Sequence, residues 1–268
     1  SFLQHYSKAL SKLKENELTP DQWLSKQILQ RELDLELEGH SYNKNLMPID
    51  QMWTFHLTIG QLASGKGAQP FKTPQDYRNW LVRLEGYLAW MKSAEDKMRL
   101  GIQKGYVLPK SLIVKVLPQL QAMAQTSVSD HLFYTPVREM PDDFTTEDQT
   151  DLIKTYTAML EDKIIPAYLR LHDFMASEYL ASGRESSGYG AFPDGAAYYD
   201  YAIRVYTTTH MDAASIHQLG LDEVARIRKE MEKVKDKVGF EGDLNVFFEK
   251  VRSAPELMPF DDPQQVID

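Results

Sequence analysis

Apolar side chains recur every three, four or seven residues along most of this chain, which is the spacing of helices with one buried face. Two segments also share a start signal, a threonine cap followed by proline and, three residues after the cap, glutamine or aspartate. The first segment runs from Thr19 to Gly39, and glycine favours a helix end. The second runs from Thr73 to Leu100 and is strongly amphipathic. The pattern therefore predicts two long helices within the first hundred residues.

Two further helices are predicted between positions 109 and 180, and each contains a proline. One begins near Pro109, and Pro118 is expected to kink it because proline lacks an N–H and clashes with the preceding turn. The other begins at Thr145, is expected to be interrupted at Pro166, and resumes over residues 168–180. Together with the first two helices, these segments predict a mainly α fold, a multi-helix domain.

The composition changes after residue 185, where glycine, serine and tyrosine replace the helical pattern. Residues 186–199 have the composition of loops and turns. Residues 198–209 are rich in β-branched and aromatic side chains and predict a small β element, most clearly over Tyr201–Thr209. We therefore divide the chain into a helical region, 1–185, and a loop–strand–helix segment, 186–268, of the same domain.

A long amphipathic helix is predicted after this β element, from a cap at Asp212 to Gly239. Charges of alternating sign from Arg226 to Lys237 flank its apolar stripe and are expected to form a solvated face. A short helix after Asp243 is expected to lead into a proline-bounded loop at 255–259.

Composition and charge exclude several classes of protein. The chain has 268 residues, a formal net charge of −9 and no cysteine. The acidic balance argues against a nucleic-acid-binding protein, which needs a basic face. Without cysteine there is no disulfide, thiolate metal site or cysteine nucleophile within these residues. Apolar runs such as 111–116 are too short to span a bilayer, so no transmembrane segment is predicted.

The seven histidines do not have the spacing of metal ligands. No His-Glu-x-x-His motif is present, and His210 precedes the helix that carries His217. We therefore predict no metal site and no catalytic residues in this chain alone, and structural roles for its histidines. No nucleophile elbow or phosphate-binding loop is present either.

The most unusual segment, residues 189–223, contains five of the fourteen tyrosines and three consecutive threonines. A glycine-punctuated loop leading into an aromatic strand is a common way to line a cleft, and an edge strand can pair with an extended peptide. The alternative is a tyrosine-rich strand that only packs against the core. Composition alone favours the packing strand, with its threonines on the solvent side.

The same segment resembles a large bacterial family, the domain-of-unknown-function family numbered 885, whose members are often described as putative lipoproteins. The resemblance covers most of the chain and is strongest at Pro193-Asp194-Gly195, Tyr198-Tyr199, Tyr206–Thr209, Ile216–Leu221, Glu223-Val224, Arg226-Ile227 and Glu230-Met231.

This resemblance implies a zincin-like helical architecture related to metallopeptidases. In that family a His-Glu-x-x-x-x-His-His motif lies C-terminal to the matching helix, beyond Asp268. We therefore expect the chain to be the N-terminal and middle portion of a longer protein, with zinc bound only in the full-length form. A lipid anchor upstream and a periplasmic or membrane-anchored location are implied in the same way.

The resemblance also suggests which residues lie near the substrate. The predicted strand would border the active-site cleft, and two residues of the following helix match recurrent family positions. The substrate-cleft candidates are Tyr199, Tyr206, Thr207, Thr208, Thr209, His217 and Glu223. Their structural alternatives are that His217 caps or bridges to a loop and that Glu223 pairs with Arg226.

Two functions follow from these observations. In the first, the chain is a fragment of a zinc-dependent peptidase-like hydrolase, inactive by itself, with a peptide or other small substrate. In the second, it is a non-catalytic helical binding or scaffold protein of the cell envelope, because no complete catalytic constellation is present.

Overall fold

Helix α4 (Pro74–Lys104) begins where the sequence predicts it and provides much of the core of the first unit. The Thr73 hydroxyl accepts a hydrogen bond from the Asp76 backbone N–H, and the Asp76 carboxylate accepts one from the Thr73 N–H. The helix ends at Gly105, whose φ of 77° is left-handed and therefore favours glycine. Most of its predicted apolar face is buried, namely Tyr77, Trp80, Leu84, Met91 and Met98, together with Tyr87, which the pattern did not include.

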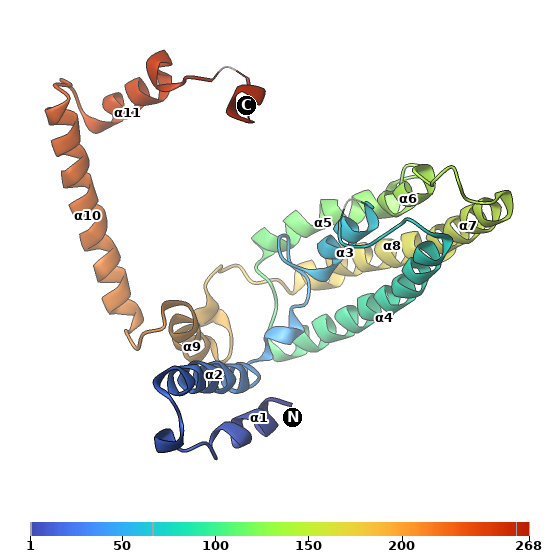
Figure 1. The fold of residues 1–268 in the computed structure, drawn as a ribbon, viewed down its shortest axis with the longest axis horizontal. Helices are drawn as coiled ribbons and strands as arrows, with labels where there is room; N and C mark the ends of the chain where they lie inside the picture. Colours follow the sequence, from blue (N-terminus) through green and yellow to red (C-terminus); the bar gives the residue numbers. More distant parts are fainter. Residues whose placement is uncertain (1, 66, 261, 268) are drawn as a thin grey trace. The chain divides into compact units, whose positions relative to one another are not determined.

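The computed structural model describes residues 2–65, 67–260 and 262–267. The chain divides into two compact units, Ser1–Tyr201 and Ala202–Asp268, and each is described by itself (Figure 1). The boundary between them comes after the change in composition at residue 185.

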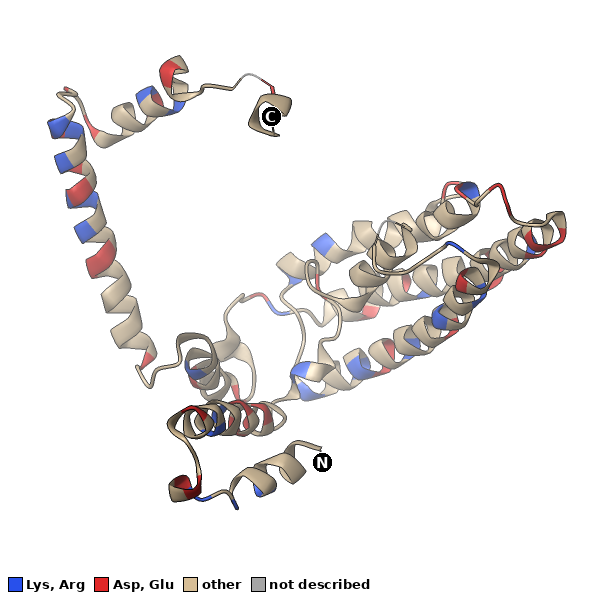
Figure 2. Ribbon diagram, viewed as in Figure 1, with Lys and Arg blue, Asp and Glu red and all other residues tan. Residues whose placement is uncertain are grey.

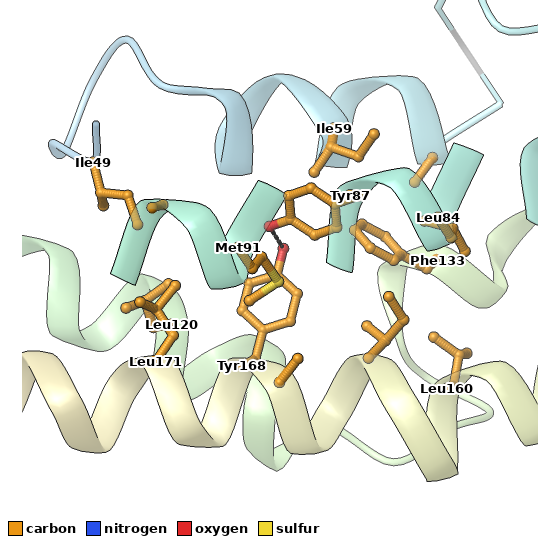
Figure 3. Close-up of a cluster of buried hydrophobic side chains, with 14 of the residues drawn as sticks. Ile49, Ile59, Leu84, Tyr87, Met91, Leu120, Phe133, Leu160, Tyr168 and Leu171 are labelled. Carbon is orange, nitrogen blue, oxygen red and sulfur yellow. Dashed lines mark hydrogen bonds between the residues drawn. The ribbon is translucent and has the colours of Figure 1, made fainter. Parts of the chain in front are cut away.

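In the first unit, α4 packs with α7 (Thr146–Met159) and α8 (Ile165–Phe174), and α5 (Lys110–Gln125) packs with α8. Figure 3 shows the centre of this core, where the Tyr87 hydroxyl donates to the Tyr168 hydroxyl at 2.8 Å. Burial raises the pKa of both phenols well above the usual value. The paired hydroxyls therefore satisfy each other inside an otherwise apolar cluster.

The helix through Pro166 continues instead of being interrupted. Two π-helical segments, η4 (Leu160–Ile164) and η5 (Met175–Tyr179), join α7 and α8 into one helical run that extends to Leu180 and beyond. Pro166 follows the first of these wide turns, which accommodates the missing N–H and the bulk of the ring. Pro118 lies inside α5, as predicted.

The predicted β element at 198–209 is wrong. Helix α9 (Gly195–Thr207) occupies this segment, and the part of the chain that the structure describes contains no strand, only an isolated bridge between Pro109 and Arg184. Tyr198 and Tyr201 lie one helical turn apart, and both pack against Tyr42. This tertiary packing outweighs the β propensity of the side chains, which depends strongly on context.

The first unit contains additional helices, two of which the hydrophobic pattern does not predict. Helix α2 (Pro20–Gly39) has the expected Thr19 capping box. The unpredicted helices α1 (Phe2–Leu10) and α3 (Phe55–Ala63) are short, so they present few turns of periodic pattern. The remaining elements are η1 (Glu15–Glu17), η2 (Asn43–Leu46), η3 (Leu132–Tyr134), α6 (Thr135–Arg138) and η6 (Tyr189–Ala191).

The second unit is dominated by α10 (Ala213–Lys237). The Asp212 carboxylate caps it by accepting from the Ser215 N–H at 2.9 Å, as predicted. Its C-terminal half carries both signs of charge, whereas its N-terminal part carries few charges (Figure 2). The predicted short helix is α11 (Leu244–Ser253), followed by η7 (Pro255–Leu257) and α12 (Gln264–Ile267). None of the described helices combines the length and hydropathy that crossing a bilayer requires.

Candidate functional site

A pocket of about 260 Å³ lies in the first unit and is lined mainly by aromatic side chains. We call it the aromatic pocket. Its walls come from three stretches of the chain: residues 42–53, 106–112 and 184–198. Its aromatic residues are Tyr42, Trp53, Tyr106, Tyr189, Phe192 and Tyr198, and its charged residues are Lys44, Asp50, Arg184 and Asp194. Apolar walls with a few polar groups are typical of small-molecule sites.

A buried aromatic pair forms one wall of the aromatic pocket. Tyr106 stacks on Phe192, with ring centroids 5.5 Å apart, and both pack on Leu46. Gly101 permits this arrangement, because a Cβ there would lie 2.5 Å from the Tyr106 carbonyl oxygen. Burial raises the pKa of the Tyr106 phenol, and the hydrogen bond to the Asp194 carboxylate raises it further.

Arg184 contributes a fixed positive charge to the aromatic pocket. Its guanidinium lies over the Phe192 ring, 4.3 Å from the centroid. Its Nε donates to the Val107 carbonyl at 2.8 Å, and its terminal nitrogen donates to the Gly188 carbonyl at 2.7 Å. Burial lowers the pKa of this guanidinium.

The Pro193-Asp194-Gly195 string follows Phe192 and contributes Asp194 to the aromatic pocket. A Cβ at Gly195 would lie 1.9 Å from the Tyr189 carbonyl oxygen, so only glycine allows the loop to approach the start of α9. Asp194 Oδ1 and Gln51 Oε1 are buried and have no hydrogen-bond partner among the described residues. Two residues of the pocket wall therefore carry an unused acceptor.

The rim of the aromatic pocket is exposed and apolar. Trp53 is 86% exposed, an unusual position for an indole. The Asp50 carboxylate holds this turn by accepting from the backbone N–H groups of Met52 and Trp53 at 2.7 and 2.8 Å. An exposed aromatic on a turn held by hydrogen bonds is well placed to cover a ligand.

The predicted cleft residues of α9 and the turn after it lie outside the lining of the aromatic pocket. Tyr199 is half exposed on α9, and Tyr206 is 83% exposed near its end. The three threonines end the helix. The Thr207 hydroxyl donates to the Ile203 carbonyl and accepts from the Thr209 N–H, while Thr208 has a φ of 58°. Their placement as a substrate-pairing strand is therefore wrong, because they form a helix terminus.

His217 and Glu223 lie on α10 with exposed side chains. Glu223 accepts from Arg226 at 2.8 Å, the pairing given as its structural alternative, and this pairing lowers the pKa of the Glu223 carboxyl. The structure does not bring Glu223 together with other predicted site residues. A role for either residue in substrate binding stays a prediction.

The described residues do not supply a zinc site. No group of three or more His, Cys, Asp or Glu side chains is arranged to hold a metal within residues 2–65, 67–260 and 262–267. Two histidines are buried in structural roles. His56 contacts the Thr54 hydroxyl at 2.6 Å, and His131 accepts from the Phe133 N–H at 3.1 Å. The donor set of the described residues therefore does not fit a zinc ion.

Sequence reasoning missed Arg184, Tyr106 and Trp53 as pocket residues, and it left open whether residues 186–199 lead into a cleft or only into a packing strand. Ser187, Tyr189, Phe192 and the following Asp194 do line the aromatic pocket. The missed residues come from stretches that have no catalytic spacing in the sequence.

Comparison with known proteins supports the resemblance. The fold matches the crystal structure of the putative lipoprotein from Colwellia psychrerythraea, with a TM-score of 0.79 and 22% identity. The match covers 90% of this chain and 43% of that chain, so this chain spans less than half the length of the relative. At this identity the similarity shows the fold alone. No curated protein matches the chain.

The match to a protein family is broader. The family described as "Bacterial protein of unknown function (DUF885)" matches residues 1–268. That range contains both the N-terminal helices and the Pro193–Met231 string on which the resemblance rests. The chain therefore belongs to the DUF885 family of bacterial proteins of unknown function.

Proposed function

We propose that this chain is the substrate-binding helical part of a peptidase-like hydrolase, and that the aromatic pocket binds one end of a peptide or similar small substrate. The observation that carries the proposal is the pocket itself, an apolar hollow with an exposed tryptophan at its rim and unused acceptors in its wall. Its volume of about 260 Å³ is just below the usual range for whole ligands, which favours one end of a longer molecule.

The hydrolytic part of this proposal rests on the family resemblance. We propose that zinc is bound in the longer protein, by residues outside this chain. Purified residues 1–268 should then contain no stoichiometric zinc, whereas the longer protein should contain about one zinc per chain. Tight binding of one zinc ion per chain by residues 1–268 would contradict the proposal that the zinc ligands lie outside this chain. It would indicate His210 and His217 as candidate ligands.

We also propose a location in the cell envelope, through a lipid anchor upstream of this chain. The proposal is supported by the description of the structural relative as a putative lipoprotein. Labelling of the longer protein with a radioactive fatty acid in its host tests it, and a soluble, unlabelled protein would contradict it.

The binding role is tested by calorimetric titration of the chain with the tripeptides Ala-Ala-Phe and Ala-Ala-Ala. We expect Ala-Ala-Phe to bind with a Kd below about 1 mM and more tightly than Ala-Ala-Ala, because its ring adds apolar area. Trp53→Ala should weaken this binding by about 10-fold, since the exposed rim side chain contacts the ligand.

Trp23→Ala is the matched control, because Trp23 lies on α2 and does not line the aromatic pocket. Equal affinities for Trp53→Ala and Trp23→Ala, or no measurable heat with either peptide, would contradict a binding role for the pocket. A longer protein that binds these peptides without hydrolysing them would support the non-catalytic alternative.

A further inference from the structure

Arg184 is held more rigidly than a surface arginine. Its backbone N–H donates to the Leu108 carbonyl at 3.0 Å, and its carbonyl accepts from the Lys110 N–H at 2.8 Å. These two bonds form the bridge that ties the end of the long helical run to the start of α5. The side chain is then fixed by two carbonyl oxygens and by the Phe192 ring. A preorganised guanidinium loses little conformational entropy when it binds a further group.

No carboxylate pairs with this arginine among the residues that the structure describes. The acid next to it, Glu185, pairs with Lys110 at 2.5 Å instead. A guanidinium has five N–H donors, and the two carbonyls use one donor each. Burial without a counter-ion also disfavours the charged form, in agreement with its lowered pKa. The remaining donors are suited to an anionic oxygen, because arginine binds carboxylates through a fork of parallel hydrogen bonds.

The acids of the aromatic pocket do not cancel this charge. The Asp50 carboxylate is engaged by two backbone N–H groups, and Asp194 interacts with the Tyr106 hydroxyl. Two acidic and two basic side chains line the pocket, so it has no net formal charge before a ligand binds. A ligand with one negative charge is therefore attracted to Arg184, and the pocket as a whole does not repel it.

The unused acceptors match the chemistry of a peptide terminus. Beside its carboxylate, a C-terminal residue carries an amide N–H, and Asp194 Oδ1 lacks a donor. Its side chain is often apolar, and the walls contributed by Tyr106, Tyr189 and Tyr198 are aromatic. A free carboxylate, one amide donor and an apolar side chain are thus the three features that these walls can recognise.

We infer that the aromatic pocket binds the free C-terminal end of a peptide, with Arg184 as the residue that recognises its carboxylate. The inference rests on the proposed function and deepens it by naming the class of substrate end. It makes Arg184 a specificity-determining residue that acts through charge, and Trp53 a residue that acts through apolar contact.

The test compares Ala-Ala-Phe with its C-terminal carboxamide, which has the same shape without the charge. We expect the acid to bind the unsubstituted chain about 10- to 100-fold more tightly than the amide, as charge-assisted hydrogen bonds allow. Arg184→Gln should remove most of this preference by weakening the acid alone, and Arg184→Lys should retain part of it. Arg228→Gln, exposed on α10, is the matched control and should keep the preference, and Lys44→Gln removes the other basic side chain of the pocket for comparison.

The unsubstituted chain alone gives the ratio of its affinities for the acid and the amide peptide. The inference therefore stays testable if an Arg184 variant does not fold. Equal binding of acid and amide would overturn the carboxylate inference while leaving a binding pocket in place. A preference that Lys44→Gln abolishes and Arg184→Gln leaves intact would also overturn it. Failure of both peptides to bind would instead remove the proposed function.

Discussion

Helices α4 and α10 are built from the same kind of sequence pattern, but only α4 buries its apolar face. Both begin with a side-chain cap and carry apolar residues at helical spacing. The apolar face of α4 lies in the core, whereas no residue of α10 is buried within the described part of its unit. Helical periodicity therefore identifies an apolar face but does not identify the residues that cover it.

The exposed face of α10 is large. Its members include Leu219, Val224, Ile227, Met231 and Val234, and near α11 the last three line a hollow together with Phe247 and Phe248. Contiguous exposed apolar surface of this kind usually marks an interaction region. Equivalent changes in the first unit and in α10 should therefore differ in their effect on stability.

The largest effect is expected from leucine truncation. Leu84→Ala in α4 removes a side chain that is only 1% exposed, so the free energy of unfolding should fall by about 2–5 kcal/mol. Leu219→Ala in α10 removes one that is 50% exposed and should change it by less than about 0.5 kcal/mol. Urea denaturation followed by circular dichroism measures both. A loss of several kcal/mol for Leu219→Ala would show that the face of α10 is covered in solution.

A smaller effect is expected from neutralising a glutamate. Glu95 on α4 is buried and accepts from Arg99 at 2.5 Å and from Arg170 at 3.3 Å. Glu95→Gln should lower the free energy of unfolding by about 1–3 kcal/mol, because hydrogen bonds to charged groups are lost at a buried position. Glu223→Gln, which breaks an exposed pair on α10, should leave the denaturation midpoint unchanged. Equal losses in the two variants would contradict the comparison.

The smallest effect concerns pH and two buried histidines. Burial lowers the pKa of His56 and of His131 below the ordinary value of 6.5. Because the unfolded chain then binds more protons, their contribution is fully present above about pH 6.5 and is lost as the pH falls towards the lowered pKa values. Stability should therefore decrease between pH 7 and pH 5.

His131→Asn isolates one of these groups. In the unsubstituted chain the Nδ1 atom of His131 accepts a hydrogen bond from the Phe133 N–H, and its Nε2 atom lies 3.1 Å from the Met123 carbonyl oxygen. The buried ring is therefore neutral, with the proton on Nε2. Asparagine keeps an acceptor for the cap without titrating, and the pH dependence of thermal unfolding should become shallower. His217→Asn, at an exposed position on α10, should leave the slope unchanged. An unchanged slope in His131→Asn would contradict this assignment.

Much of the fold could be predicted because its signals are local. The caps at Thr19, Thr73 and Asp212 form as expected, and the helices they begin end close to the predicted residues. The error at Tyr201–Thr209 has a specific cause, since its β-branched and aromatic side chains suit a strand, while the packing of Tyr201 against Gly39 and Tyr42 favours a helix. Short helices such as α3 lacked enough turns to be recognised.

The candidate site could be predicted only in part. The composition of residues 186–199 predicted loop and turn structure; residues 187–194 contribute to the lining of the aromatic pocket, whereas residues 195–199 belong to α9. Arg184 and Tyr106 were not recognised, because neither belongs to a catalytic motif and they line the same pocket only in the folded chain, where a backbone bridge joins Pro109 and Arg184. Long-range contacts of this type leave no periodic trace in a sequence.

The mainly helical class, the positions of the capped helices and the family could be read from the amino-acid sequence, since capping, periodicity and the Pro193–Met231 string are local properties. Only the tertiary structure decided that residues 195–207 are a helix, that the apolar face of α4 is buried and that Arg184 faces an aromatic pocket. These features depend on contacts between residues far apart in the chain, where packing and desolvation outweigh local preference.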